Sequence, residues 1–145
     1  METVAELLKH KGSDVVTVAP DASVFEALKI MESKNIGAVL VVDEEGEVSG
    51  IMTERDYARK VILRDRSSRS TPVTDIMTRE VVIVRPGSTV EEAMAIMTRK
   101  RCRHLPVVEN GELAGLISIG DVVKALINEK EFVIDQLEHY IAGSL

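Results

Sequence analysis

Hydrophobic and polar positions follow the same order twice along this chain. β-Branched runs at residues 15–18 and 81–84 each lead to a proline, which lacks an amide donor and so favours the end of a strand. Each run is followed by apolar residues at helical spacing, which predict an amphipathic helix. These residues are Val24, Ala27, Leu28 and Met31 in the first case and Val90, Ala93, Met94 and Met97 in the second.

Two further apolar runs follow each predicted helix and indicate a β-hairpin. The paired runs are 38–42 with 48–52, and 105–108 with 113–117. Glu45-Gly46 separates the first pair and Asn110-Gly111 the second, and Asn-Gly between apolar runs strongly favours a two-residue hairpin turn. A last helix is expected from near Thr53 and from near Ser118. The predicted order is therefore β-α-β-β-α, twice.

The expected helix starts carry N-terminal signals. Ser23 precedes Glu26 by three residues, and Thr89 precedes Glu92 by three, which is the spacing of a capping box. Residues 3–8 and 71–77 look like equivalent short helical segments that lead into the two copies. The duplication is therefore expected to extend upstream of each first strand.

The two halves are related in sequence as well as in pattern. Residues 15–62 align with 81–127 when one residue near Glu45 is skipped, and seventeen of the forty-seven aligned positions are identical. Self-similarity at this length indicates two copies of one folding unit. Because about 60 residues bury too little surface alone, we expect the copies to share a core in one α+β domain. The expected boundaries are 1–64 and 73–127 for the repeats, with a polar connector at 65–72.

A segment at 128–145 continues the last helix and has no counterpart in the first repeat. Its apolar positions are Phe132, Val133, Leu137, Tyr140 and Ile141. The amphipathic pattern leaves two interpretations open: a helix packed on the repeats, or an arm that grips another subunit.

Composition narrows the class of protein. The single Cys102 cannot form an internal disulfide, no basic-then-apolar N-terminal segment resembles a signal peptide, and no apolar run has the length of a membrane span, so we expect a cytoplasmic protein. The net charge of −6 opposes general nucleic-acid binding. Residues 55–103, however, carry twelve basic and six acidic side chains, a net of +6. This basic centre suits a compact anion such as a phosphate, although charge alone favours a solvated surface.

Both hairpins end in a similar motif. Gly50 and Gly115 are each followed by two apolar residues, a hydroxyl residue, two variable residues and an aspartate, which is Asp56 or Asp121. One interpretation is simple N-capping of the following helix. The other is ligand binding, because a helix N-terminus attracts an anion while the hydroxyl and the carboxylate hydrogen-bond a phosphate and a ribose. The spacing fits both, and the glycine and apolar residues, which capping does not require, favour the ligand.

The repeated unit, with its G-h-h-T/S-x-x-D ending (h, apolar) and the Arg103-His104-Leu105-Pro106-Val107-Val108 run, resembles the cystathionine-β-synthase-type (CBS) domain. The resemblance covers the chain to about Asn128, and the tandem is similar to a CBS pair, or Bateman module. It implies two pseudo-two-fold-related repeats packed sheet to sheet into one disc. It also implies two clefts for adenosine-containing ligands such as AMP, ADP, ATP, NAD(H) or S-adenosylmethionine.

The resemblance also implies which residues line each cleft, because each cleft takes its hydroxyl and aspartate from one repeat and a strand edge from the other. The first cleft would consist of Thr53, Asp56, Val81, Val82, Arg103 and His104. The second cleft would consist of Ser118, Asp121, Val15, Val16, Arg55 and Ala38. Gly37 and Ala38 stand where the other copy has Arg103 and His104, so we expect unequal sites, with the first binding a phosphorylated adenosine ligand more tightly.

These observations favour a regulatory module without catalytic residues or a required cofactor, which binds AMP, ATP or NAD(H). It would form a homodimer and signal ligand state to an unknown partner protein through its conformation or assembly. The alternative is a ligand-free scaffold that acts through dimerisation and its C-terminal helix. An enzyme is the least supported class, because the chain lacks a nucleophile elbow and a glycine-rich phosphate loop. His10, His104 and His139 have no metal-ligand spacing, so no metal site is expected.

Overall fold

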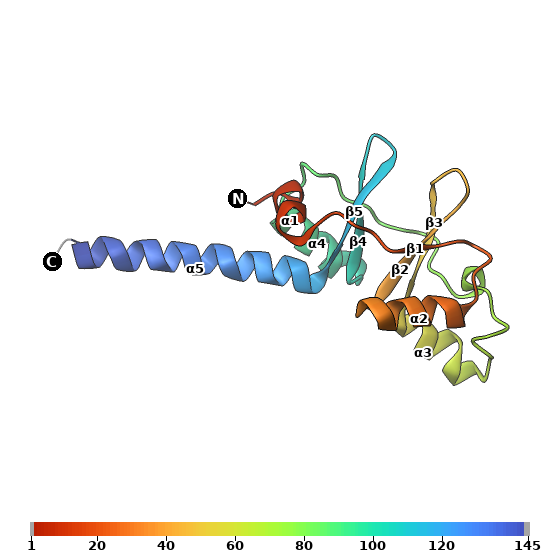
Figure 1. The fold of residues 1–145 in the computed structure, drawn as a ribbon. Coiled ribbons are helices and arrows are strands. Elements are labelled where there is room, and N and C mark those ends of the chain that lie inside the picture. Colours follow the sequence, from red (N-terminus) through yellow and green to blue (C-terminus); the bar gives the residue numbers. More distant parts are fainter. Residues whose placement is uncertain (1, 144–145) are drawn as a thin grey trace. The chain divides into compact units, whose positions relative to one another are not determined.

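The computed structural model describes the backbone of residues 2–143 and the side chains of 2–128 and 134–138. The chain divides into two compact units, which do not follow the order of the sequence. Unit 1 combines the first segment, up to Ser13, with the residues from Ile83 onward, and unit 2 is the continuous stretch Asp14–Val82. The short segment ahead of the first repeat therefore packs with the second repeat (Figure 1).

Unit 2 contains a three-stranded sheet with two helices. Its elements are β1 (Thr17–Val18), α2 (Val24–Lys34), β2 (Ala38–Val42), β3 (Val48–Thr53), α3 (Glu54–Lys60) and the 3₁₀ turns η1 (Ile62–Arg64) and η2 (Val73–Asp75). The strand order is β1-β2-β3, with β1 parallel and β3 antiparallel to β2. Val39 and Val41 of β2 and Met52 of β3 belong to one buried cluster with the inner face of α2, Val24, Ala27 and Met31. This is the face that the helical spacing predicts.

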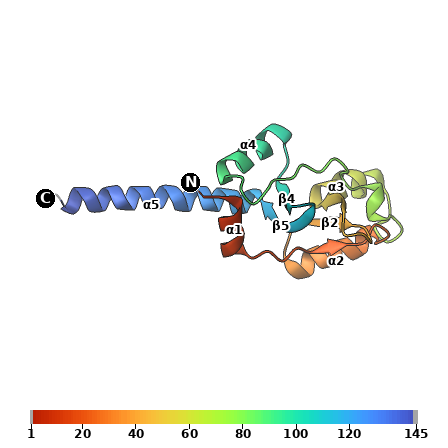
Figure 2. The ribbon, with the colours of Figure 1, turned by 90° about the horizontal axis from the view of Figure 1, so that it is seen from above.

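Unit 1 is built around a two-stranded sheet. Its elements are α1 (Val4–Lys11), α4 (Val90–Lys100), β4 (His104–Glu109), β5 (Glu112–Ser118) and α5 (Ile119–Gly143). Leu105 and Val107 of β4 and Ile117 of β5 are fully buried, as are Val4 of α1 and Val122 of α5. Figure 2 shows α5 running from the end of β5 past α1 and α4. With the two sheets and five helices of the described chain, the α+β class is confirmed.

Both predicted hairpins are present, with strands that match the apolar runs to within one residue at each end. Asn110 and Gly111 have φ angles of 52° and 77°. Positive φ at both central residues is what a type I′ turn requires, and Asn and Gly tolerate it best. The hydroxyl half of each predicted capping box forms: the Glu26 amide donates to Ser23 Oγ at 3.0 Å and the Glu92 amide to Thr89 Oγ1 at 3.1 Å.

The strand predicted at 81–84 is wrong in extent, because only a single parallel bridge between Val84 and Val107 forms there. The counterpart at 15–18 also shortens, to Thr17–Val18. In unit 2 the Leu40 amide donates to the Val16 carbonyl at 3.4 Å, and this hydrogen bond is part of the pairing between β1 and β2. Pro106 stands at the position of Leu40 in the second repeat and has no amide to donate, so the second ladder stops.

The segment predicted as a helix at 71–77 forms only the 3₁₀ turn η2. Its backbone is engaged with the start of α2 instead: the Val24 amide donates to Thr71 O at 2.8 Å, and the Val73 amide donates to Ala22 O at 2.9 Å. The equivalent first segment does form a helix, α1. In the C-terminal extension, the backbone of α5 is helical as expected. The side chains of Phe132, Val133, Tyr140 and Ile141 lie outside the described residues.

Candidate functional site

The first motif forms a reciprocal capping box at the start of α3. Thr53 Oγ1 accepts a hydrogen bond from the Asp56 amide at 3.1 Å, and Asp56 Oδ2 accepts from the Thr53 amide at 3.0 Å. The Thr53 hydroxyl also donates to Asp56 Oδ2 at 3.1 Å. The carboxylate is only 12% exposed. The capping interpretation of this motif is therefore correct in unit 2, and the cap fixes the orientation of the aspartate.

Lys60 completes the arrangement around Asp56. Its ammonium lies 3.2 Å from Asp56 Oδ1, one helical turn further along the chain, and donates to the Ile76 carbonyl at 2.8 Å. A ligand hydroxyl that used Asp56 would therefore meet a carboxylate that is already paired with a cation on one oxygen. Ala38 lies opposite Thr53 in the β2-β3 register and is fully buried.

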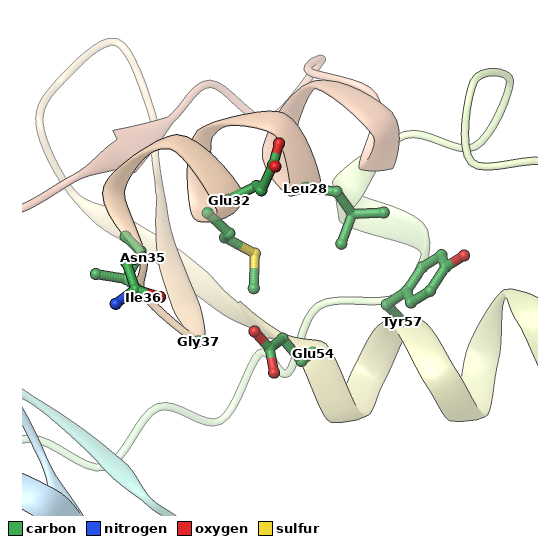
Figure 3. A pocket seen from close by; sticks show the side chains of 8 residues that line it. Leu28, Glu32, Asn35, Ile36, Gly37, Glu54 and Tyr57 are labelled. Carbon is green, nitrogen blue, oxygen red and sulfur yellow. The ribbon is translucent and has the colours of Figure 1, made fainter.

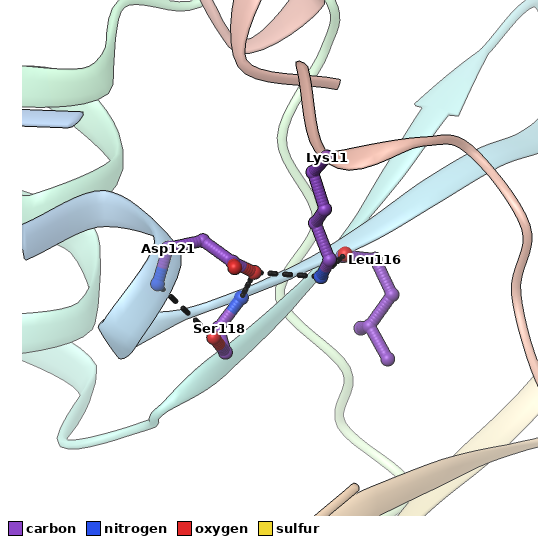
Figure 4. A network of polar contacts seen from close by, with 4 residues as sticks. All are labelled: Lys11, Leu116, Ser118 and Asp121. Carbon is purple, nitrogen blue, oxygen red and sulfur yellow. Dashed lines mark hydrogen bonds and ion pairs between the residues drawn. The ribbon is translucent and has the colours of Figure 1, made fainter. Parts of the chain in front are cut away.

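The second motif has the same local geometry at the start of α5 (Figure 4). The Asp121 amide donates to Ser118 Oγ at 3.2 Å, and the Ser118 amide donates to Asp121 Oδ2 at 2.8 Å. Asp121 also has a lysine partner, but from a distant part of the sequence. The Lys11 ammonium, at the end of α1, lies 2.6 Å from Asp121 Oδ2 and 2.6 Å from the Leu116 carbonyl.

These contacts set the ionisation of Asp121. Burial alone would raise the pKa of this carboxyl, but the hydrogen bonds from Lys11 and Ser118 and the charge of Lys11 outweigh it, so the pKa lies below its usual value. Asp121 is therefore an anion at neutral pH. Lysines thus link both motif aspartates to a main-chain carbonyl, Lys60 in unit 2 and Lys11 in unit 1.

His104 is next to the second motif within unit 1. It lies opposite Ser118 in the β4-β5 register, and the carbonyl of Arg103 accepts the first amide of α5, that of Ile119, at 2.8 Å. Burial lowers the pKa of His104, and the nearby charges of Lys11 and Arg103 lower it further, while Asp121 opposes them. The imidazole is therefore neutral at pH 7. Arg103 itself is exposed.

The motif glycines have a packing role. A Cβ on Gly50 would lie 2.6 Å from Met77 Sδ and 2.8 Å from the Thr78 carbonyl. A Cβ on Gly115 would lie 2.8 Å from a methyl carbon of Leu8. In both units the glycine lets the lead-in segment approach the hairpin closely. Its presence in the motif therefore does not by itself favour the ligand interpretation over capping.

A separate pocket of about 720 Å³ opens on unit 2 between α2 and the start of α3 (Figure 3). It is lined by Leu28, Met31, Glu32, Asn35, Ile36, Gly37, Glu54 and Tyr57. None of the predicted ligand residues belongs to it, although Glu54 and Tyr57 are next to three of them in sequence, Thr53, Arg55 and Asp56. This pocket therefore reaches the first motif only through Glu54, one of its two variable residues.

The structure distributes the predicted ligand residues between the units. Unit 2 holds Thr53, Asp56, Val81, Val82, Val15, Val16, Arg55 and Ala38, and unit 1 holds Ser118, Asp121, Arg103 and His104. Within each unit the hydroxyl residue and the aspartate meet as predicted. The assignment of all twelve residues to two ligand clefts stays a prediction.

Two residues at the motifs were missed from the sequence. Lys60 is four residues after Asp56, a spacing at which oppositely charged side chains meet on a helix, so the sequence did contain a signal for it. Lys11 lies 110 positions before Asp121, and nothing in the spacing connects them.

Among the described residues, no group of three His, Cys, Asp or Glu side chains is arranged to hold a metal ion. No helix in the described part of the chain is long and apolar enough to cross a membrane.

Comparisons with solved structures support this fold. The chain is 50% identical to the CBS-domain containing protein ATU1752 from Agrobacterium tumefaciens, with a TM-score of 0.81 over 85% of this chain and 92% of that one. It is 25% identical to the CBS domain pair of protein MJ0100, with a TM-score of 0.80 over 89% of this chain and 98% of that one. The MJ0100 structure is a complex with 5′-methylthioadenosine and S-adenosyl-L-methionine.

Sequence comparisons identify the repeated unit. The chain is 41% identical over 149 aligned positions to the mitochondrial CBS domain-containing protein CBSX3 of Arabidopsis thaliana, covering 97% of this chain and 72% of the relative. The family model for the CBS domain matches twice, at residues 4–63 and 73–128. Two matches in tandem, each containing a Thr/Ser-x-x-Asp cap of the same geometry, show that the chain belongs to the CBS-domain family as a CBS pair.

Proposed function

We propose that this CBS pair is a regulatory module that binds an adenosine-containing ligand at its two Thr/Ser-x-x-Asp motifs. The observation that carries the proposal is the matching geometry of Thr53 with Asp56 and of Ser118 with Asp121. In each motif a carboxyl group is held beside a hydroxyl at the first turn of a helix. A fixed carboxylate accepts hydrogen bonds from vicinal ribose hydroxyls without a further loss of side-chain entropy. The complex of MJ0100 supports this ligand class.

The proposed ligands are AMP, ATP or NAD(H). Thr53, Asp56, Val81 and Val82 would contact the ligand of the first motif, and Ser118 and Asp121 that of the second. The CBS resemblance assigns all of these residues, and every assignment remains a prediction: it also adds Arg103 and His104 to the first cleft, and Val15, Val16, Arg55 and Ala38 to the second. Arg103 carries a permanent charge suited to a phosphate, whereas a neutral His104 would act as a hydrogen-bonding group.

The two sites are proposed to be unequal, with the first binding the phosphorylated ligand more tightly. Isothermal titration of AMP, ATP, NADH and S-adenosylmethionine against Asp56→Ala and Asp121→Ala tests this. We expect the larger loss of affinity from Asp56→Ala. Equal losses would refute the asymmetry, and no binding of any of the four ligands to the unmodified protein would refute the function.

A stability control separates a lost contact from a weakened fold. Thr89→Ala removes a helix N-cap of the same type outside either motif, which costs about 1 kcal/mol. This variant should bind as the unmodified protein does. A ligand at a hundred times its dissociation constant should also raise the free energy of unfolding by about 2.7 kcal/mol, which thermal melting detects.

Binding is proposed to act through assembly. A ligand shifts an equilibrium between two arrangements only by its differential affinity for them, so the partner protein must distinguish those arrangements. We propose a homodimer in the cytoplasm that regulates another protein and catalyses no reaction itself. Light scattering with and without AMP or ATP measures the assembly directly.

A further inference from the structure

Helix α5 carries an exposed apolar stripe beyond the core of unit 1. Val122 and Ala125 are the buried residues of its first turns, at 0% and 7% exposure. Past Leu126 every described side chain of the helix is exposed, including Ile127 at 49%, Ile134 at 55% and Leu137 at 58%. Figures 1 and 2 both show this part of α5 extending past the other elements of unit 1.

The exposed apolar residues share one face of the helix. Val123, Ile127, Ile134 and Leu137 are separated by four, seven and three residues, so at 3.6 residues per turn they fall within about 80° of the helix circumference. Spacings of three, four and seven are those of the a and d positions in a coiled coil. A helical extension of about four turns is marginal by itself in water and gains its stability from packing of such a face.

We propose that this stripe pairs with the same stripe of a second copy, as an antiparallel coiled coil. The charged residues beside the stripe select this partner and this direction. Lys124 and Glu138 are exposed, follow Val123 and Leu137 directly, and lie on the same flank of the stripe. They are 14 residues apart, or about 21 Å at 1.5 Å per residue.

Antiparallel pairing aligns opposite charges at both ends of the contact. When Ile127 of one copy lies level with Leu137 of the other, Lys124 of the first copy is two residues, or about 3 Å along the axis, from the level of Glu138 of the second, and two-fold symmetry repeats both contacts. Parallel pairing would instead place Glu138 level with Glu138 and Lys124 level with Lys124. A second copy of this chain therefore pairs Ile127 with Leu137 and brings Lys124 near Glu138 at both ends of the contact.

Disulfide cross-linking tests the pairing in the full chain. In a Cys102→Ser background, Ile127→Cys combined with Leu137→Cys should give a covalent dimer on mild oxidation, resolved on a non-reducing gel. Within one helix these positions are about 15 Å apart and cannot join. Either substitution alone should give no dimer, because antiparallel copies hold identical positions about 15 Å apart along the axis.

The matched control places two cysteines that would also lie level with each other on another face of the helix. Asn128→Cys combined with Gln136→Cys uses two exposed positions away from the stripe. Efficient cross-linking of this control would indicate random collision and overturn the proposal. Dimers from the single variants would indicate parallel pairing, and no dimer from any variant would show that the stripe does not meet a second copy; either result overturns it as well.

Charge reversal adds an independent readout. In the Ile127→Cys, Leu137→Cys background, Lys124→Glu or Glu138→Lys alone should slow disulfide formation at low salt, and the two reversals together should restore it. Equal rates in all four proteins would contradict the charge pairing. These measurements need no ligand, so they can fail while the adenosine-binding proposal stands, and the reverse is equally true.

Discussion

The ammonium of Lys11 binds the carboxylate of Asp121 across 110 positions of sequence, with 2.6 Å between the charged atoms. The same ammonium holds the carbonyl of Leu116, so α1 is fastened to the end of β5 and to the start of α5 together. The second motif is therefore completed by the opposite end of the described chain.

The first prediction concerns the strength of this contact. Lys11→Met removes the charge but keeps an apolar stem, and it should lower the free energy of unfolding at pH 7 by about 1 kcal/mol or less. The magnitude is small because the lysine and aspartate side chains are 36% and 24% exposed, and solvent screens such pairs. Urea unfolding measures the change. Lys9→Met, on the same helix, is the control, and an equal loss there would contradict a specific role for Lys11.

The second prediction gives the pH dependence of that contact. Because the folded-state pKa of Asp121 lies below its unfolded value of about 4, the stabilisation is present above pH 4 and is lost as pH falls through the folded pKa. The stability difference between the unmodified protein and Lys11→Met should therefore shrink on acidification. Carboxyl NMR titration should show a higher pKa for Asp121 in Lys11→Met. An unchanged pKa would contradict the assigned cause.

The third prediction concerns His104. Its pKa is lowered in the folded state, so the unfolded chain binds more protons, and the stabilisation present above about pH 6.5 decreases as pH falls through the folded pKa. Urea midpoints measured from pH 8 to pH 5 should fall less steeply for His104→Gln than for the unmodified protein. His10→Gln, at an exposed position, should keep the original slope. Identical slopes for all three proteins would refute the prediction.

The fourth prediction ranks the loss of stability caused by alanine substitution at three glycines. Gly50→Ala should destabilise unit 2 by about 1–3 kcal/mol, because the new methyl group meets the Thr78 main chain. Gly115→Ala should cost less, since the atoms in its way belong to the end of the Leu8 side chain. Gly87→Ala, which meets nothing within 4 Å, should be close to neutral. Thermal melting of the three variants gives the order, and a neutral Gly50→Ala would contradict the packing role.

The fifth prediction concerns Cys102. Burial raises the pKa of this thiol. The thiolate is the reactive form, so alkylation by iodoacetamide at pH 8 should be slower in the folded protein than in urea. Mass spectrometry of timed samples measures both rates. Equal rates would show that the thiol is as ionised and accessible as in the unfolded chain.

Features determined by neighbouring residues were predictable from the sequence. The Asn110-Gly111 turn, the Ser23 and Thr89 caps and the buried faces of α2 and α4 depend on contacts within a few residues. Features determined by distant residues were not. The second copy of the first strand is reduced to a bridge by Pro106 in a different element, and the Val73 amide of η2 donates to the carbonyl of Ala22, just before α2.

The candidate site divides in the same way. Pairing of Thr53 with Asp56 and of Ser118 with Asp121 follows from spacing of three residues at a helix start. The role of Gly50 could not be read from the motif, because its neighbour Thr78 is joined to it only by tertiary structure. For the same reason the Lys11 contact has no sequence signature.

The discontinuous make-up of unit 1 has a consequence for biosynthesis. All of unit 2 lies in one stretch that ends at Val82, whereas unit 1 joins the segment before Asp14 to residues from Ile83 onward. During translation, α1 is synthesised long before β5 and Asp121, with which it packs. All residues of unit 2 are available once Val82 has been synthesised. Unit 2 should therefore fold first on the ribosome, and the Lys11 contact should be among the last to form.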